Sequence, residues 1–148
     1  MTYNQQNIFF AIEYVLAALV IGISTWRSLQ LDVRKRIGRR TFLLRLIPVI
    51  VAVIFGVTAI AAIYLLHVDG ATKNTAVTAA LLVMTVFCYS VLGASAVQRF
   101  RVYPRGAMLA SVMILMYITA DLFMPAGVKF AVLAAMIAIG VFLPDEWK

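Results

Sequence analysis

Five long apolar stretches run through the chain, and they constrain its fold more than any other feature. They cover approximately residues 8–26, 46–66, 76–97, 106–124 and 128–143. An α-helix needs about 20 apolar residues to cross a hydrocarbon core about 30 Å thick, because each residue adds about 1.5 Å. The 64% hydrophobic content and the mean hydropathy of +1.00 point the same way. We therefore expect an all-α integral membrane protein, a bundle of about five transmembrane helices forming one membrane domain over residues 1–148.

The last two stretches are the shortest, and Pro125, Ala126 and Gly127 separate them. Proline and glycine favour a turn, so we expect two spans joined tightly. The alternative is four spans followed by a re-entrant hairpin, since each stretch is near the lower limit of about 17 residues. The first stretch is preceded by no basic residue, so we expect it to be a retained span rather than a signal peptide.

The positive charges predict the orientation. Loop 27–45 carries seven basic residues and one acid, a net charge of +6 in a chain of net +7. Segment 99–105 adds three arginines, whereas the other links carry only Lys73 and Lys129. By the positive-inside rule both basic segments are cytoplasmic. Five spans then place the N-terminus outside and the C-terminus in the cytoplasm. We expect a bacterial cytoplasmic (inner) membrane protein.

Composition also narrows the chemistry. A chain of 148 residues made mostly of apolar stretches leaves no room for a soluble catalytic domain, so we expect no enzyme activity and no cofactor. Cys88 is the single cysteine, and His67 with Asp69 is too small a set of ligands to hold a metal ion. The basic loop has one aromatic residue and no recognisable binding module, so we expect no nucleic-acid partner.

Glu13 and Asp121 are the only acids inside the apolar stretches. An ionisable group in the hydrocarbon costs about 2.5–3.5 kcal/mol on insertion scales, so such residues usually have a functional partner. In the expected topology both acids lie towards the outer side, where they form a candidate proton or cation site. The alternative is that each acid lies at the membrane interface, where it is solvated by headgroups or bonded to a serine, threonine or tyrosine on a neighbouring helix.

The basic loop has two interpretations. Its charges Arg34, Lys35, Arg36, Arg39 and Arg40 set the topology, or they also bind anionic lipid headgroups, each charge being worth about 1 kcal/mol. Leu29, Val33, Ile37 and Leu44 recur near helical spacing, which is compatible with an amphipathic helix on the membrane surface.

Small residues recur four apart along several stretches, a pattern that lets membrane helices approach closely. The candidate helix-packing residues are Ala18, Gly22, Ala52, Gly56, Gly127, Ala131 and Ala135.

Three hypotheses about function follow. The first is a non-enzymatic protein that packs against partners, as an accessory subunit of a membrane complex or as a homo-oligomer. The second is a small proton- or cation-coupled transporter or channel that uses Glu13 and Asp121. The third is a protein that handles anionic lipids. The mutual position of the two acids separates the first hypothesis from the second.

Overall fold

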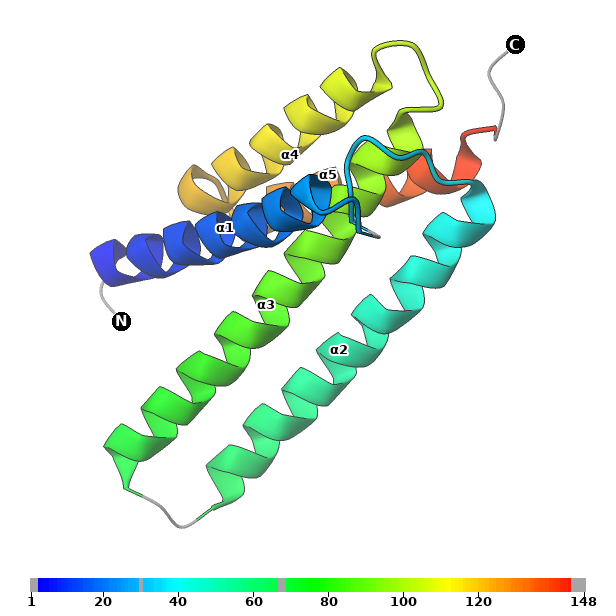
Figure 1. The fold of residues 1–148 in the computed structure, drawn as a ribbon. Coiled ribbons are helices and arrows are strands. Elements are labelled where there is room, and N and C mark those ends of the chain that lie inside the picture. Colours follow the sequence, from blue (N-terminus) through cyan, green and yellow to red (C-terminus); the bar gives the residue numbers. More distant parts are fainter. Residues whose placement is uncertain (1–2, 30, 67–68, 145–148) are drawn as a thin grey trace.

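The protein folds into five α-helices (Figure 1). A computed structural model describes residues 3–29, 31–66 and 69–144. The helices are α1 (Tyr3–Trp26), α2 (Arg39–Leu65), α3 (Gly70–Phe100), α4 (Gly106–Phe123) and α5 (Ala126–Phe142). Within these described ranges there is no β-strand, so the all-helical fold expected from the sequence is confirmed.

Four of the helices are long and apolar enough to cross a membrane, namely α1, α2, α3 and α4. The fifth, α5, is also apolar but has only 17 residues, a length of about 26 Å. Large apolar side chains lie on the outside of the bundle, with Phe55 76% exposed and Leu65 81% exposed. Helices that are apolar all round need an apolar surrounding, which indicates a membrane protein.

The central helix is α3, which packs against each of the other four. Figure 1 shows α2 beside α3 as a long hairpin, with α1 and α4 on the other side of α3. Gly56 of α2 makes the hairpin tight, because a Cβ atom at this position would overlap the side chain of Met84.

The helices extend beyond the apolar stretches. α1 begins at Tyr3 rather than near residue 8, and α3 begins at Gly70 rather than near residue 76. Hydropathy marks the part of a helix that suits hydrocarbon, whereas backbone hydrogen bonding continues through the polar residues that flank it.

The basic loop is shorter than the predicted 27–45, because α2 already begins at Arg39. Arg39, Arg40 and Arg45 therefore lie on α2, while Arg34, Lys35 and Arg36 lie in the link before it. The described part of this link forms turns, so the amphipathic helix considered for it is wrong. Gly38, the residue before α2, has an extended backbone and separates the turns from the helix.

Candidate functional site

Glu13 lies ten residues, about 15 Å, after the first residue of α1, and its side chain is buried, only 2% exposed. The hydroxyl of Thr85 on α3 donates a hydrogen bond of 2.9 Å to its carboxylate. A hydroxyl both donates and accepts, so this bond serves the ionised and the protonated form of Glu13.

Asp121 lies near the end of α4 and is paired with a lysine. The Nζ atom of Lys129, on α5, is 2.8 Å from a carboxylate oxygen of Asp121. The side chains of Lys129 and Asp121 are 20% and 3% exposed, so the ion pair is largely buried. Tyr14, next to Glu13 on α1, donates its phenol hydrogen bond to the other oxygen of Asp121.

Three tyrosines join these charged groups into one cluster. The rings of Tyr14 and Tyr89 stack with their centroids 5.2 Å apart. Tyr117 meets Tyr89 edge to face at 5.8 Å, and their hydroxyls are 3.4 Å apart. We call the set of Glu13, Tyr14, Thr85, Tyr89, Tyr117, Asp121 and Lys129 the acid–tyrosine cluster.

The structure thus places Glu13 and Asp121 in one cluster, since Tyr14, the neighbour of Glu13 on α1, donates to Asp121. Their role as a proton or cation site stays a prediction. The sequence analysis allowed for a serine, threonine or tyrosine partner on a neighbouring helix but did not identify Thr85 or Tyr14, because threonine and tyrosine are not unusual in a membrane helix. The spacing of Thr85 and Tyr89 was a usable signal, since residues four apart share a helix face.

A cavity of about 580 Å³ lies beside this cluster and is lined by residues of all five helices. Tyr14, Thr85, Tyr89 and Tyr117 are among its lining residues, and its walls are almost wholly apolar. Cavities of roughly 300–1,000 Å³ hold small-molecule ligands in many proteins.

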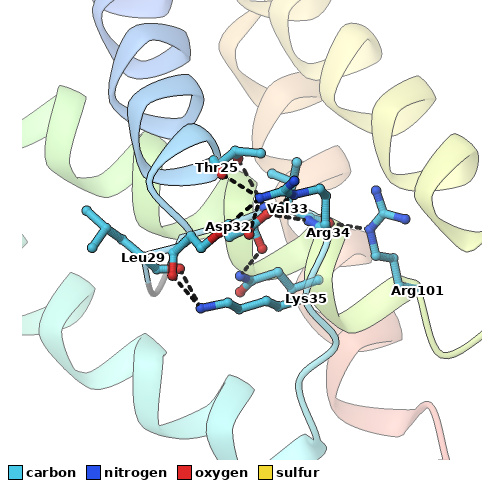
Figure 2. A network of polar contacts seen from close by, with 9 residues as sticks. Thr25, Leu29, Asp32, Val33, Arg34, Lys35 and Arg101 are labelled. Atoms are coloured by element: carbon cyan, nitrogen blue, oxygen red, sulfur yellow. Dashed lines mark hydrogen bonds and ion pairs between the residues drawn. The ribbon is translucent and has the colours of Figure 1, made fainter.

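The link between α1 and α2 is locked by its own charges (Figure 2). Arg34 forms a two-pronged ion pair with Asp32, both distances being 3.0 Å, and it donates to the carbonyl of Thr25 at 2.8 Å. Lys35 donates to the carbonyl of Leu29 at 3.1 Å. The hydrogen bonds from Arg34 hold the pKa of the Asp32 carboxyl below its ordinary value. At least two charges of the predicted topology loop therefore also hold its fold.

This link is anchored on the end of α3. The side-chain amide of Gln98 donates to the carbonyl of Asp32 at 2.6 Å, and the backbone N–H of Ile37 donates to the carbonyl of Gln98 at 3.4 Å. Arg101 donates to the carbonyl of Val33, as Figure 2 shows. The basic segments before α2 and after α3 therefore lie at the same end of the bundle, which we call the basic end.

Arg99 is fully buried at the basic end, although the sequence analysis assigned it to a loop. It donates to the carbonyl of Gly140 at 2.9 Å and to that of Leu143. Arg39 also donates to the Leu143 carbonyl, at 3.2 Å. The last carbonyls of a helix have no partner within it and carry partial negative charge, so cations stabilise them. Arg36 and Arg40 have exposed side chains, and their binding to lipid headgroups stays a prediction.

The small residues differ in burial. Gly56 is buried in the α2–α3 contact, and Ala52 is half-buried. Ala18 is exposed but borders the cavity, and Gly22, Gly127, Ala131 and Ala135 are also exposed.

No group of three or more potential metal ligands occurs in the part of the chain that the structure describes. His67 lies outside the described residues, and Asp69 is exposed. Cys88 is buried on α3, close to the backbone of α2. No family model, curated protein or solved structure matches the chain.

Proposed function

We propose that the chain crosses the membrane five times, with the N-terminus outside and the basic end in the cytoplasm. α5 supports a fifth span because its length of about 26 Å approaches a hydrocarbon core of about 30 Å. Replacing the charged side chains Arg34, Lys35, Arg36, Arg39 and Arg40 by glutamine should scramble the orientation of tags at the two ends. An unchanged orientation would contradict the assignment.

We propose that the protein is a non-enzymatic, proton- or cation-coupled transport protein whose binding site is the acid–tyrosine cluster. A charge imbalance supports this function. The cluster contains two acids, Glu13 and Asp121, but one basic residue, Lys129. Both acids are buried: Glu13 is 2% exposed, and the side chain of Asp121 is 3% exposed. With all three groups ionised the cluster carries one uncompensated negative charge at a depth where charge is costly. Binding one proton or one monovalent cation neutralises it.

Glu13 is the group that takes up this proton or cation. Asp121 already has a cation at 2.8 Å and a phenol hydrogen bond, so its charge is satisfied. Glu13 has a neutral partner, Thr85, which suits its carboxylate and its protonated form equally. Asp121 and Lys129 accordingly position the tyrosines and fix the local charge, while Glu13 exchanges its proton or cation.

A flux measurement tests this proposal. The protein is reconstituted in liposomes, a pH or monovalent-cation gradient is imposed, and proton or cation movement is followed with an entrapped dye. We expect Glu13→Gln to abolish the flux of the parent protein, because the amide keeps the shape and removes the exchangeable charge. The matched control is Asp69→Asn, an acid-to-amide change at an exposed residue outside the cluster, which should keep the parent flux.

Two results would refute the transport function. One is a correctly folded parent protein that moves neither protons nor monovalent cations under any imposed gradient. The other is a Glu13→Gln variant with the same flux as the parent.

Packing against partner helices is the second candidate function, and one feature of α5 supports it. Gly127, Ala131 and Ala135 are exposed, and a Cβ atom at Gly127 would have no neighbour within 4 Å. A smooth row of small residues suits close approach of another helix. Cross-linking in mild detergent should then trap an oligomer or a complex in the parent, and the bulky Ala131→Phe should weaken it. A parent protein that is strictly monomeric and without partners would refute this candidate.

A further inference from the structure

The cavity is an elongated space within the membrane-crossing helices. Its α3 wall runs from Met84 to Gly93, nine residues or about 14 Å along the helix axis. Its α1 wall runs from Tyr14 to Ile21, about 11 Å. A chain held along these walls would reach across most of one leaflet, since half of a hydrocarbon core of about 30 Å is about 15 Å.

The polar residues of the α3 wall are separated along this length. Thr85 lies near the first end of the wall, Tyr89 lies just beyond its midpoint, and Leu92 and Gly93 lie at the other end. Among the residues that the structure describes, no charged side chain lines the cavity, and two of its lining residues, Tyr14 and Thr85, donate to the acids Asp121 and Glu13. The cavity therefore suits a neutral molecule with an apolar chain and one polar group that meets a hydroxyl.

The hydroxyls leave one hydrogen-bond donor for such a molecule. The phenol proton of Tyr14 goes to Asp121, and the hydroxyl proton of Thr85 goes to acceptors that include Glu13. Tyr89 and Tyr117 share one bond between two hydroxyls, so this pair keeps one further proton among the interactions recorded for the described residues. That proton points to a ligand oxygen, such as a hydroxyl or carbonyl oxygen, as the acceptor.

We propose that this cavity is a binding site for a single-chain neutral lipid, whose head oxygen accepts a hydrogen bond from the Tyr89–Tyr117 pair and whose chain lies along the apolar walls of the cavity. The bilayer is the source of such a ligand, because the cavity lies among helices that cross it. α1 and α2 both line the cavity, and α3 packs closely against each of them. This site needs no proton coupling, so its test is independent of the flux measurement.

Photo-cross-linking tests the site directly. The full-length protein in lipid nanodiscs is labelled with a fatty alcohol that carries a diazirine on its chain, and the labelled peptides are located by mass spectrometry. We expect labelling of cavity residues such as Leu92 and Met136, saturable and competed by unlabelled fatty alcohol. A diazirine hydrocarbon of equal length without the oxygen should bind about fivefold more weakly, the equivalent of one hydrogen bond.

Matched glycine variants separate the cavity from the lipid-exposed surface. Gly93→Leu places a side chain in the cavity, where a Cβ atom makes ordinary contact with Ile21 at 3.7 Å, so the helix accepts it. Gly22→Leu is the same change at an exposed helical glycine with open space around it. We expect Gly93→Leu to weaken fatty alcohol binding about tenfold and Gly22→Leu to leave it unchanged.

A second variant keeps the cavity volume and removes only the donor. In the double variant Tyr89→Phe with Tyr117→Phe, the fatty alcohol and the hydrocarbon probe should bind equally well. The control Tyr64→Phe changes an exposed tyrosine and should keep the fivefold preference for the alcohol. Labelling confined to exposed positions, or equal labelling in Gly93→Leu and Gly22→Leu, would overturn the site. An alcohol preference that survives the double variant would overturn the assigned head position.

Discussion

Removing the cation of the buried ion pair should destabilise the protein strongly. In Lys129→Met the carboxylate of Asp121 loses its partner at 2.8 Å while its side chain stays only 3% exposed. Breaking a buried pair by removing one partner typically costs about 3–5 kcal/mol, since the remaining charge is stranded. Because Lys129 is 20% exposed and Tyr14 still donates to Asp121, we expect the lower end, about 3 kcal/mol of unfolding free energy.

Unfolding in mixed micelles gives this free energy. The fraction of a denaturing detergent is raised, and helix loss is followed by circular dichroism in the parent and the variants. The matched control is Lys73→Met at the start of α3, where the ammonium group makes only an exposed contact of 3.3 Å with the carbonyl of Tyr64. That variant should stay within about 0.5 kcal/mol of the parent.

A double variant shows whether stranded charge is the cause. Adding Asp121→Asn to Lys129→Met removes both charges of the pair, so we expect it to recover more than half of the lost free energy. The reasoning is refuted if Lys129→Met unfolds within about 0.5 kcal/mol of the parent, or if the double variant is less stable than the single one.

Two further predictions follow from the packing and the basic end. Gly140→Ala should lower the unfolding free energy by about 1–3 kcal/mol, because its Cβ atom would lie 2.5 Å from the buried ring of Phe42. The control Gly127→Ala places its Cβ atom in open space and should not destabilise the protein. Equal unfolding free energies for the two variants in the same detergent titration would contradict the Gly140–Phe42 contact. Hydrogen bonds from Arg34 lower the pKa of the Asp32 carboxyl, so this carboxyl stays ionised at a pH below the ordinary carboxyl pKa of about 3.9. The backbone amides of the link should therefore stay protected from hydrogen exchange below that pH, and lose the protection when the carboxyl is protonated at still lower pH. Asp32→Ala should lose this protection already at neutral pH, and an unchanged protection factor at Arg34 would show that the pair does not hold the link.

The helices were predictable because hydropathy over 15–20 residues is a strong signal, but their ends were not. The polar residues between Asp69 and Ala76 look like a loop by composition, yet α3 already begins at Gly70. Water and headgroups accept polar side chains on a helix as readily as on a loop, so composition alone does not mark where the backbone hydrogen bonds stop.

The candidate site was predictable in part. Glu13 and Asp121 stood out because a charge inside an apolar stretch is rare. Their partners did not stand out, since choosing Thr85 and Tyr14 among many hydroxyl groups requires the packing of α1, α3 and α4. The partner Lys129 did not stand out either, because it was counted only as a basic residue of a link, whereas its ammonium group lies against Asp121.

The two charged regions of the molecule satisfy their charges by different means. At the basic end Arg99 is fully buried, but the last carbonyls of α5 provide the partial negative charge that it needs. Among the described residues no cation makes an ion pair with Glu13, and the backbone N–H groups around it are already bonded within α1. We therefore propose that a proton or a cation from outside the chain neutralises it. This difference is why we assign a structural role to the buried arginine and an exchange role to the buried glutamate.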